Sequence, residues 1–121
     1  MNAKTAELLK RTFDFGVSTL KFLRKLPKDK IYSVITYQLA KAATSVGANY
    51  EEAQGAESKK DFSHKIGIVL KEIRESNYWF RILNEVLQDS QSNSELIKLL
   101  DESNQLKQIF SSIKISSSKK Y

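Results

Sequence analysis

The sequence predicts an all-α protein, an antiparallel up-down-up-down four-helix bundle. Apolar residues recur at helical spacing in four segments between about residues 4 and 113. The segments are separated by short joints rich in proline, glycine or serine, and short joints make successive helices antiparallel neighbours. With 121 residues the chain can build one hydrophobic core, so we expect residues 1–121 to form a single domain.

The first segment, before Pro27, carries two apolar stripes. We assign the first stripe to the core: it contains Leu9, Phe13, Gly16, Leu20 and Leu23. The second contains Leu8, Thr12, Phe15, Thr19, Phe22 and Leu26. One bundle cannot bury both, and Trp79 adds a further apolar side chain outside the core seam of the third segment. We therefore predict self-association through Leu8, Phe15, Phe22 and Trp79, the alternative being a wide core face with some exposed aromatics.

The second and third segments show the clearest periodicity. Their predicted core residues are Ile31, Ile35, Leu39, Ala42, Val46, Asn49 and Ala53, then Phe62, Ile66, Val69, Ile73, Ser76, Phe80, Leu83 and Leu87. In the joint between them, Gly55 is expected to adopt the left-handed conformation that ends a helix. Ser58 is expected to cap the third helix by accepting a hydrogen bond from the amide of Asp61.

The fourth segment places Leu96, Leu99, Ser103, Leu106, Phe110 and Ile113 on one face. Ser92 and Glu95 have the spacing of a capping box at its start, and residues 114–121 are expected to fray. Three glycines lie inside helical segments, where each costs about 1 kcal/mol relative to alanine. For Gly16, Gly47 and Gly67 we predict tight helix crossings, and a ligand contact is the weaker alternative.

The net charge is +6, and the excess lies in the first half of the chain. Residues 1–60 carry 11 Lys and Arg against 6 Asp and Glu, whereas residues 61–121 carry 9 against 8. Six cations gather near the end of the first helix: Arg11, Lys21, Arg24, Lys25, Lys28 and Lys30. They predict a surface that binds nucleic acid through phosphate contacts, with little sequence preference because no aromatic residue is interleaved. A solvated charged face is the alternative.

Catalytic and metal-binding patterns are weak. Without cysteine the chain has no disulfide, thiolate ligand or thiol nucleophile. Asp61 and His64 have the spacing of one carboxylate–histidine pair, but a bundle metal site needs a second histidine. Glu72 and Glu75 lie beside Lys71 and Arg74, which favours surface ion pairs over acid–base chemistry. We expect no enzyme activity, cofactor or metal, and with no signal peptide or membrane-spanning run we expect a cytoplasmic protein.

Three runs carry a family resemblance. They are Gln38-Leu39-x-Lys41-Ala42-Ala43-x-Ser45-x-Gly47-Ala48-Asn49-x-x-Glu52-Ala53, Ser58-Lys59-Lys60-Asp61-Phe62 and Lys71-Glu72-x-x-Glu75-Ser76-x-Tyr78-Trp79. Together they resemble the bacterial four-helix-bundle family named after the intervening sequences of 23S ribosomal RNA genes. The signature positions are Asn49, Glu52, Ser58, Lys60 and Glu75.

The resemblance implies a small cytoplasmic, non-enzymatic bundle that assembles as a ring-shaped homo-oligomer, typically a pentamer. A related branch serves as the accessory protein of diversity-generating retroelements and binds nucleic acid and a reverse transcriptase. Two function classes therefore follow: a nucleic-acid-binding protein, with RNA favoured, or an oligomeric scaffold for a protein partner such as a reverse transcriptase.

Overall fold

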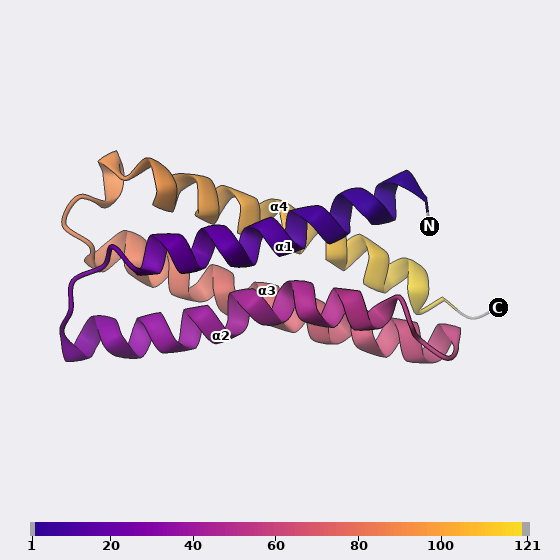
Figure 1. Ribbon diagram of the computed structural model, residues 1–121. Helices are drawn as coiled ribbons and strands as arrows, with labels where there is room; N and C mark the ends of the chain where they lie inside the picture. The colour runs from indigo at the N-terminus through magenta and orange to yellow at the C-terminus, as the bar shows by residue number, and fades with distance from the viewer. Residues whose placement is uncertain (1, 120–121) are drawn as a thin grey trace.

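A computed structural model describes residues 2–119 as four long helices joined by short connections. The elements are α1 (Ala3–Leu23), α2 (Lys30–Ala53), α3 (Lys59–Val86), a 3₁₀ turn η1 (Ser90–Ser92) and α4 (Ser94–Ser117). Successive helices run in opposite directions, and the start of α1 and the end of α4 lie at the same end of the bundle (Figure 1). The predicted antiparallel four-helix bundle is thus confirmed.

Each helix begins at a polar side chain that accepts a hydrogen bond from the backbone three residues later. The four caps are Asn2, Asp29, Ser58 and Asn93, with N–H···O distances of 2.8, 3.0, 3.0 and 3.0 Å. The predicted cap at Ser58 is confirmed. The prediction at Ser92 is wrong by one residue, because Asn93 caps α4 while Ser92 belongs to the preceding 3₁₀ turn. An asparagine cap satisfies a free amide as well as serine does.

The end of α2 also differs from the prediction. No glycine in the described part of the chain has a positive φ, so Gly55 does not adopt the left-handed conformation. Instead the last turn tightens: the amides of Gln54 and Gly55 donate to the carbonyls of Glu51 and Glu52 at 3.1 and 3.0 Å. Satisfying these carbonyls in a 3₁₀ turn removes the need for a left-handed residue.

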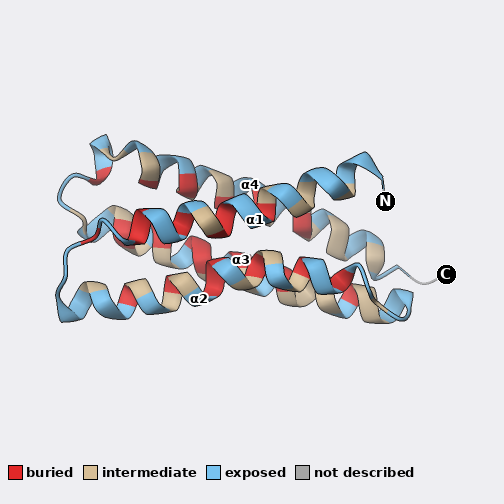
Figure 2. Cartoon of the chain, viewed as in Figure 1, coloured by how far each residue is buried: buried red, intermediate tan, exposed pale blue. Residues whose placement is uncertain are grey.

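All four helices contribute buried residues to one core, and Figure 2 shows them distributed along each helix. The predicted core faces of α2, α3 and α4 are correct, with Ile31 as the outlier at 71% exposed. On α1 the two stripes are largely exchanged, although Gly16 and Leu23 of the predicted core stripe are buried as expected. Phe13 and Leu20 are 67% and 43% exposed, whereas Phe15 and Phe22 are 2% and 1% exposed. The stripe that we assigned to a subunit interface is the core face of α1.

Two threonines explain this exchange. Thr12 and Thr19 lie on the buried stripe and look unfavourable there in a sequence. Their hydroxyls donate to the carbonyls of Leu8 at 2.8 Å and Phe15 at 2.7 Å, so neither polar group is left unsatisfied. The rings of Phe15 and Phe22 meet Phe80 of α3 at centroid distances of 6.0 and 6.5 Å. These aromatic contacts hold the buried face of α1 against α3.

The helices α1 and α2 cross closely at two of the predicted glycines. A Cβ atom on Gly47 would lie 3.1 Å from the carbonyl oxygen of Thr12, and one on Gly16 would lie 3.5 Å from the carbonyl oxygen of Ala43. Gly67 has another role, since the nearest atom to its Cβ position is the Lys114 ammonium at 3.4 Å. The prediction of a tight crossing therefore holds for Gly16 and Gly47 and is wrong for Gly67, which faces a side chain.

The end of α4 is helical beyond the predicted fraying point. The helix continues to Ser117, and residues 120–121 of the expected frayed tail lie outside the described residues. The Lys114 ammonium donates to the carbonyl and hydroxyl of Ser63 at 2.9 and 3.0 Å, and the Ser63 and Ser118 hydroxyls are 2.9 Å apart. These contacts with the first turn of α3 hold the last turn of α4 in place.

Candidate nucleic-acid interface

The six cations predicted to form one basic surface divide into two groups. Lys21, Arg24, Lys28 and Lys30 are exposed and lie around the last turn of α1 and the joint to α2. We call these four residues the α1 basic end. Within residues 2–119 none of them forms an ion pair, and the Lys28 ammonium donates to the carbonyl of Arg24 at 2.9 Å. Their charges are therefore available to an anionic partner.

Arg11 lies nearer the N-terminus of α1 and has a carboxylate partner. Its guanidinium makes a two-pronged contact with Glu102 of α4, with Nε 3.1 Å from Oε2, and also donates to Gln105 at 3.3 Å. Hydrogen bonding to Glu102 raises the pKa of Arg11. Because only 27% of each side chain is exposed, this pair joins α1 to α4 and contributes little positive potential to the surface.

Lys25 is also paired, at the exposed end of the same two helices. Its ammonium lies 2.8 Å from a carboxylate oxygen of Glu95. Between the two ion pairs, a groove of about 340 Å³ separates α1 from α4. The ionisable side chains that line it are Arg11, Asp14, Lys21, Glu95, Lys98 and Glu102. Three cations and three carboxylates balance, so this groove is not a basic channel.

The predicted interface anchors do not gather on the surface. Phe15 and Phe22 belong to the core, and Leu8 and Trp79 are partly buried against it. Phe15 and Phe22 were wrongly placed because the two stripes of α1 were exchanged. On α1 the exposed apolar side chains Phe13 and Leu20 belong to the other stripe and border a groove of about 450 Å³ between α1 and α2. Its floor includes the crossing glycines Gly16 and Gly47.

The five signature positions serve separate local contacts. Ser58 caps α3, and the amide of Asn49 donates to the carbonyl of Ser45 at 2.8 Å inside α2. Glu75 accepts a hydrogen bond from the Trp79 indole at 3.4 Å. Glu52 and Lys60 are exposed near the turn between α2 and α3. Because Ser58 and Glu75 are 17 residues apart on one helix, or about 25 Å, these positions do not form a single site.

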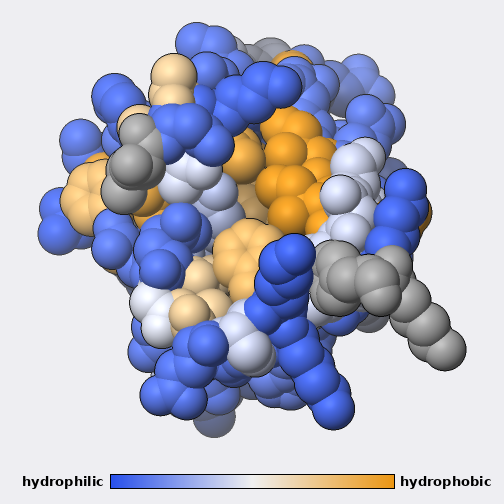
Figure 3. Space-filling view, turned by 90° about the vertical axis from the view of Figure 1, so that its right-hand side faces the viewer, coloured by the Kyte–Doolittle hydropathy of each residue, from blue (hydrophilic) through white to orange (hydrophobic). Residues whose placement is uncertain are grey.

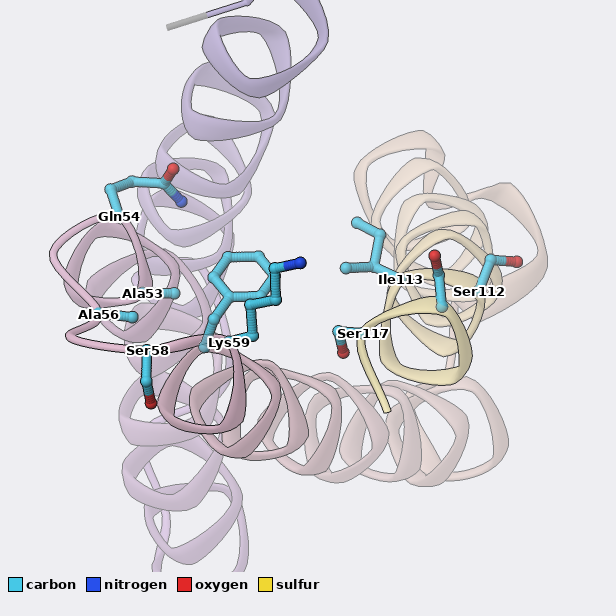
Figure 4. Close-up of a pocket in the computed structure, with 10 residues that line it drawn as sticks. Ala53, Gln54, Ala56, Ser58, Lys59, Ser112, Ile113 and Ser117 are labelled. Atoms are coloured by element: carbon cyan, nitrogen blue, oxygen red, sulfur yellow. The ribbon is translucent and has the colours of Figure 1, made fainter. Parts of the chain in front are cut away.

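An open hollow lies at the end of the bundle where α1 begins and α4 ends. Figure 3 shows apolar surface at the centre of this end, surrounded by hydrophilic side chains. In Figure 4, Ala53, Gln54 and Lys59 lie on one side of the hollow and Ser112, Ile113 and Ser117 on the other. Its volume is about 640 Å³, and Lys59 is the ionisable residue of its lining. This lining provides no acid–base pair and no activated nucleophile.

Metal binding and membrane insertion find no support in the described residues. No three His, Asp or Glu side chains of residues 2–119 come together in a way that could hold a metal ion. None of the four long helices of this part of the chain has the length and apolar character needed to cross a bilayer.

A second basic surface lies on the outside of α3 and was missed in the sequence analysis. Lys71, Arg74, Tyr78 and Arg81 follow one another at steps of three, four and three residues, and all four are exposed. We call them the α3 outer face. A count of charges hides this face, because the eight acidic residues of the second half nearly cancel its cations in the sum, although two of them, Glu95 and Glu102, pair with Lys25 and Arg11. The three-and-four spacing of cations around an aromatic residue was the available signal.

Comparisons with known proteins identify the family. The family model described as 23S rRNA-intervening sequence protein matches residues 4–112. A crystal structure from Bacteroides thetaiotaomicron, described as a protein with unknown function from the S23 ribosomal protein family, is 26% identical. It aligns over 88% of this chain and 96% of its own, with a TM-score of 0.78. A comparison with curated proteins gave no match.

These descriptions name no enzyme, and nothing in them carries the expected link to diversity-generating retroelements. The match extends over the three runs that carry the resemblance and reaches all four helices, including α1 and α4, which lie outside those runs. The chain therefore belongs to the 23S rRNA-intervening sequence protein family.

Proposed function

We propose that this protein is a non-enzymatic RNA-binding protein that acts as a homo-oligomer. The observation that carries the proposal is the α1 basic end, where four exposed cations lie within ten residues and have no carboxylate partner in the described chain. The net charge of +6 and the family description, which refers to intervening sequences of 23S rRNA, support an RNA ligand.

Phosphate contacts account for binding of this kind. Lysine and arginine that neutralise phosphates release condensed counterions, so affinity falls steeply as salt rises. The α1 basic end contains no aromatic side chain on which a base could stack. It is therefore suited to binding the RNA backbone with little dependence on sequence.

Self-association would multiply these contacts. The groove between α1 and α2 exposes Phe13 and Leu20 over a floor of small residues, which suits the insertion of an apolar side chain from a second copy. A cyclic pentamer is the form that the family resemblance implies. In a ring the α1 basic end would be repeated once in each subunit. Several weak contacts with the same RNA would then act together and raise the overall affinity.

The RNA proposal is tested by binding at several salt concentrations. Lys21→Glu, Arg24→Glu and Lys28→Glu together are expected to weaken binding of a fluorescein-labelled structured RNA at least tenfold and to flatten the salt dependence. Lys4→Glu, Lys41→Glu and Lys119→Glu change the net charge equally at other exposed positions and serve as the matched control. If both triple variants bind RNA like the native protein, the RNA-binding proposal is replaced by the alternative, an oligomeric scaffold for a protein partner.

The oligomer is tested separately by light scattering. Phe13→Glu is expected to lower the molar mass while keeping helicity, because a charge on this face opposes burial against a second copy. Ile31→Glu is the control, since Ile31 is equally exposed but lies outside the groove. A native protein that is monomeric at tens of micromolar contradicts self-association.

A further inference from the structure

The α3 outer face carries an arginine that is held in place by the core. The Nε of Arg81 donates to the side-chain oxygen of Asn77 at 3.1 Å. Asn77 is 3% exposed, and its amide nitrogen donates to Ser103 at 2.9 Å and to Asn104 at 3.0 Å, both on α4. Two helices thus fix the orientation of Asn77, and Asn77 fixes that of Arg81. The remaining N–H groups of this exposed guanidinium have no carboxylate partner within residues 2–119.

Arg81 lies over an exposed aromatic ring. Its guanidinium carbon is 5.7 Å from the ring centroid of Tyr78, which is 46% exposed. Tyr78 also meets the ring of Trp79 in an edge contact, at a centroid distance of 5.2 Å and an interplanar angle of 76°. Tyr78 and Arg81 therefore present flat surfaces that are oriented by the partly buried Trp79 and the buried Asn77. Unpaired bases stack on such aromatic rings and guanidinium planes in RNA-binding proteins.

Two further cations extend this surface along the helix. Arg74 is one turn before Tyr78, and Lys71 is another turn before Arg74. From Lys71 to Arg81 the face spans about 15 Å, which is longer than a single phosphate group needs. Glu85 lies one helical turn after Arg81 on the same side of α3 but forms no ion pair within residues 2–119, and Glu75 accepts a hydrogen bond from the Trp79 indole on the adjoining side.

We infer that the α3 outer face binds unpaired nucleotides of RNA, with a base stacked on the Tyr78–Arg81 pair and the flanking phosphates against Arg74 and Lys71. The inference rests on the proposed RNA-binding function and adds a selectivity to it. The α1 basic end contacts the backbone of any RNA. The α3 outer face accepts a base only where that base is free of a duplex, because a base inside a duplex is already stacked on its neighbours.

The experiment compares single-stranded and duplex RNA. The probes are a labelled oligouridylate of about 12 nucleotides and an RNA duplex of the same length, each titrated with the native protein and its variants. Tyr78→Ala is expected to weaken binding of the single strand about tenfold and to leave binding of the duplex unchanged. Tyr78→Phe keeps the ring and is expected to bind within about twofold of the native protein.

Control variants separate stacking from charge and from damage to the fold. Tyr37→Ala removes another exposed tyrosine, which lies on α2 and is 65% exposed, and this variant is expected to bind both probes normally. The variant with Lys21→Glu, Arg24→Glu and Lys28→Glu is expected to bind both probes more weakly, by the same factor. Arg81→Gln is expected to weaken binding of the single strand. Far-ultraviolet circular dichroism checks that every variant keeps its helicity. The single strand is also expected to quench the fluorescence of Trp79, the sole tryptophan, through its contact with Tyr78.

The outcomes distinguish the two proposals. If the native protein binds neither probe, RNA binding and the α3 site are both overturned. If it binds both probes, but Tyr78→Ala and Arg81→Gln bind the single strand like the native protein, the α3 site is overturned and the proposed function stands. A native protein without preference for the single strand, and without Trp79 quenching, also overturns the α3 site.

Discussion

The two seams that α1 makes with its neighbours are built in opposite ways. Against α2, the two backbones come close together at Gly16 and Gly47, and at Gly47 an added Cβ would lie only 3.1 Å from a backbone oxygen. Against α4, α1 makes far fewer contacts, and the ion pairs of Arg11 and Lys25 bridge the gap. The α1–α2 seam is therefore specified by shape, whereas the α1–α4 seam is specified by charge and is the looser of the two.

Adding one methyl group to the α1–α2 seam is expected to have the largest effect. In Gly47→Ala the new Cβ would approach the carbonyl oxygen and carbon of Thr12 at 3.1 and 3.2 Å. These are backbone atoms that cannot rotate away, so overpacking outweighs the gain in helix propensity. We expect a net loss of about 1 to 2 kcal/mol in the free energy of unfolding, measured by urea denaturation. Unchanged or increased stability would show that the crossing adjusts freely.

Breaking the Arg11–Glu102 pair is expected to loosen the α1–α4 seam to a smaller extent. A double-mutant cycle with Arg11→Met and Glu102→Gln is expected to give a coupling energy of about 1 kcal/mol, because the pair is two-pronged and mostly shielded. The coupling should shrink in about 1 M salt. A coupling near zero at low salt would mean that this contact does not hold α1 to α4.

Gly16→Ala tests whether the two crossing glycines differ. A Cβ at Gly16 would make ordinary contacts of 3.5 Å with Ala43 and Thr44. With no clash to overcome, the better helix propensity of alanine is expected to raise the free energy of unfolding by about 0.5 kcal/mol. The same urea measurement used for Gly47→Ala checks the sign. A loss as large as that of Gly47→Ala would mean that the whole seam is overpacked.

The smallest effect is expected at the outer end of the α1–α4 seam. The side chains of Lys25 and Glu95 are 66% and 43% exposed, so water competes for both charges. A double-mutant cycle with Lys25→Met and Glu95→Gln is expected to give a coupling of a few tenths of a kcal/mol. A coupling as large as that of Arg11 and Glu102 would contradict the difference in shielding between the two pairs.

The same contrast explains what the sequence could predict. Helix number, direction and the core faces of α2, α3 and α4 follow from periodicity, because each of these helices has one dominant apolar face. On α1 two stripes compete, and Thr12 and Thr19 weaken the stripe that is buried. Their hydrogen bonds to backbone carbonyls remove the cost of burial, and a hydropathy pattern does not register those bonds.

The contacts of the charged residues were even harder to predict from the sequence. Arg11 and Lys25 resemble Lys21 and Arg24 in sequence, but their partners Glu102 and Glu95 are about 70 to 90 residues away. A seam between the first and last helices brings them together, and no local pattern reveals it. In the same way Asn77 reads as an ordinary polar residue of α3, although its contacts with α4 orient Arg81.

The looseness of the α1–α4 seam has a consequence for folding kinetics. Most helix contacts join elements that follow one another in the chain, so loop closures are short and folding is expected to be fast. The pairing of the first and last helices is the one that must wait for the whole chain, and it is also the weakest. If it forms after the transition state, breaking Arg11–Glu102 will speed unfolding and leave the folding rate almost unchanged, which stopped-flow measurements can resolve.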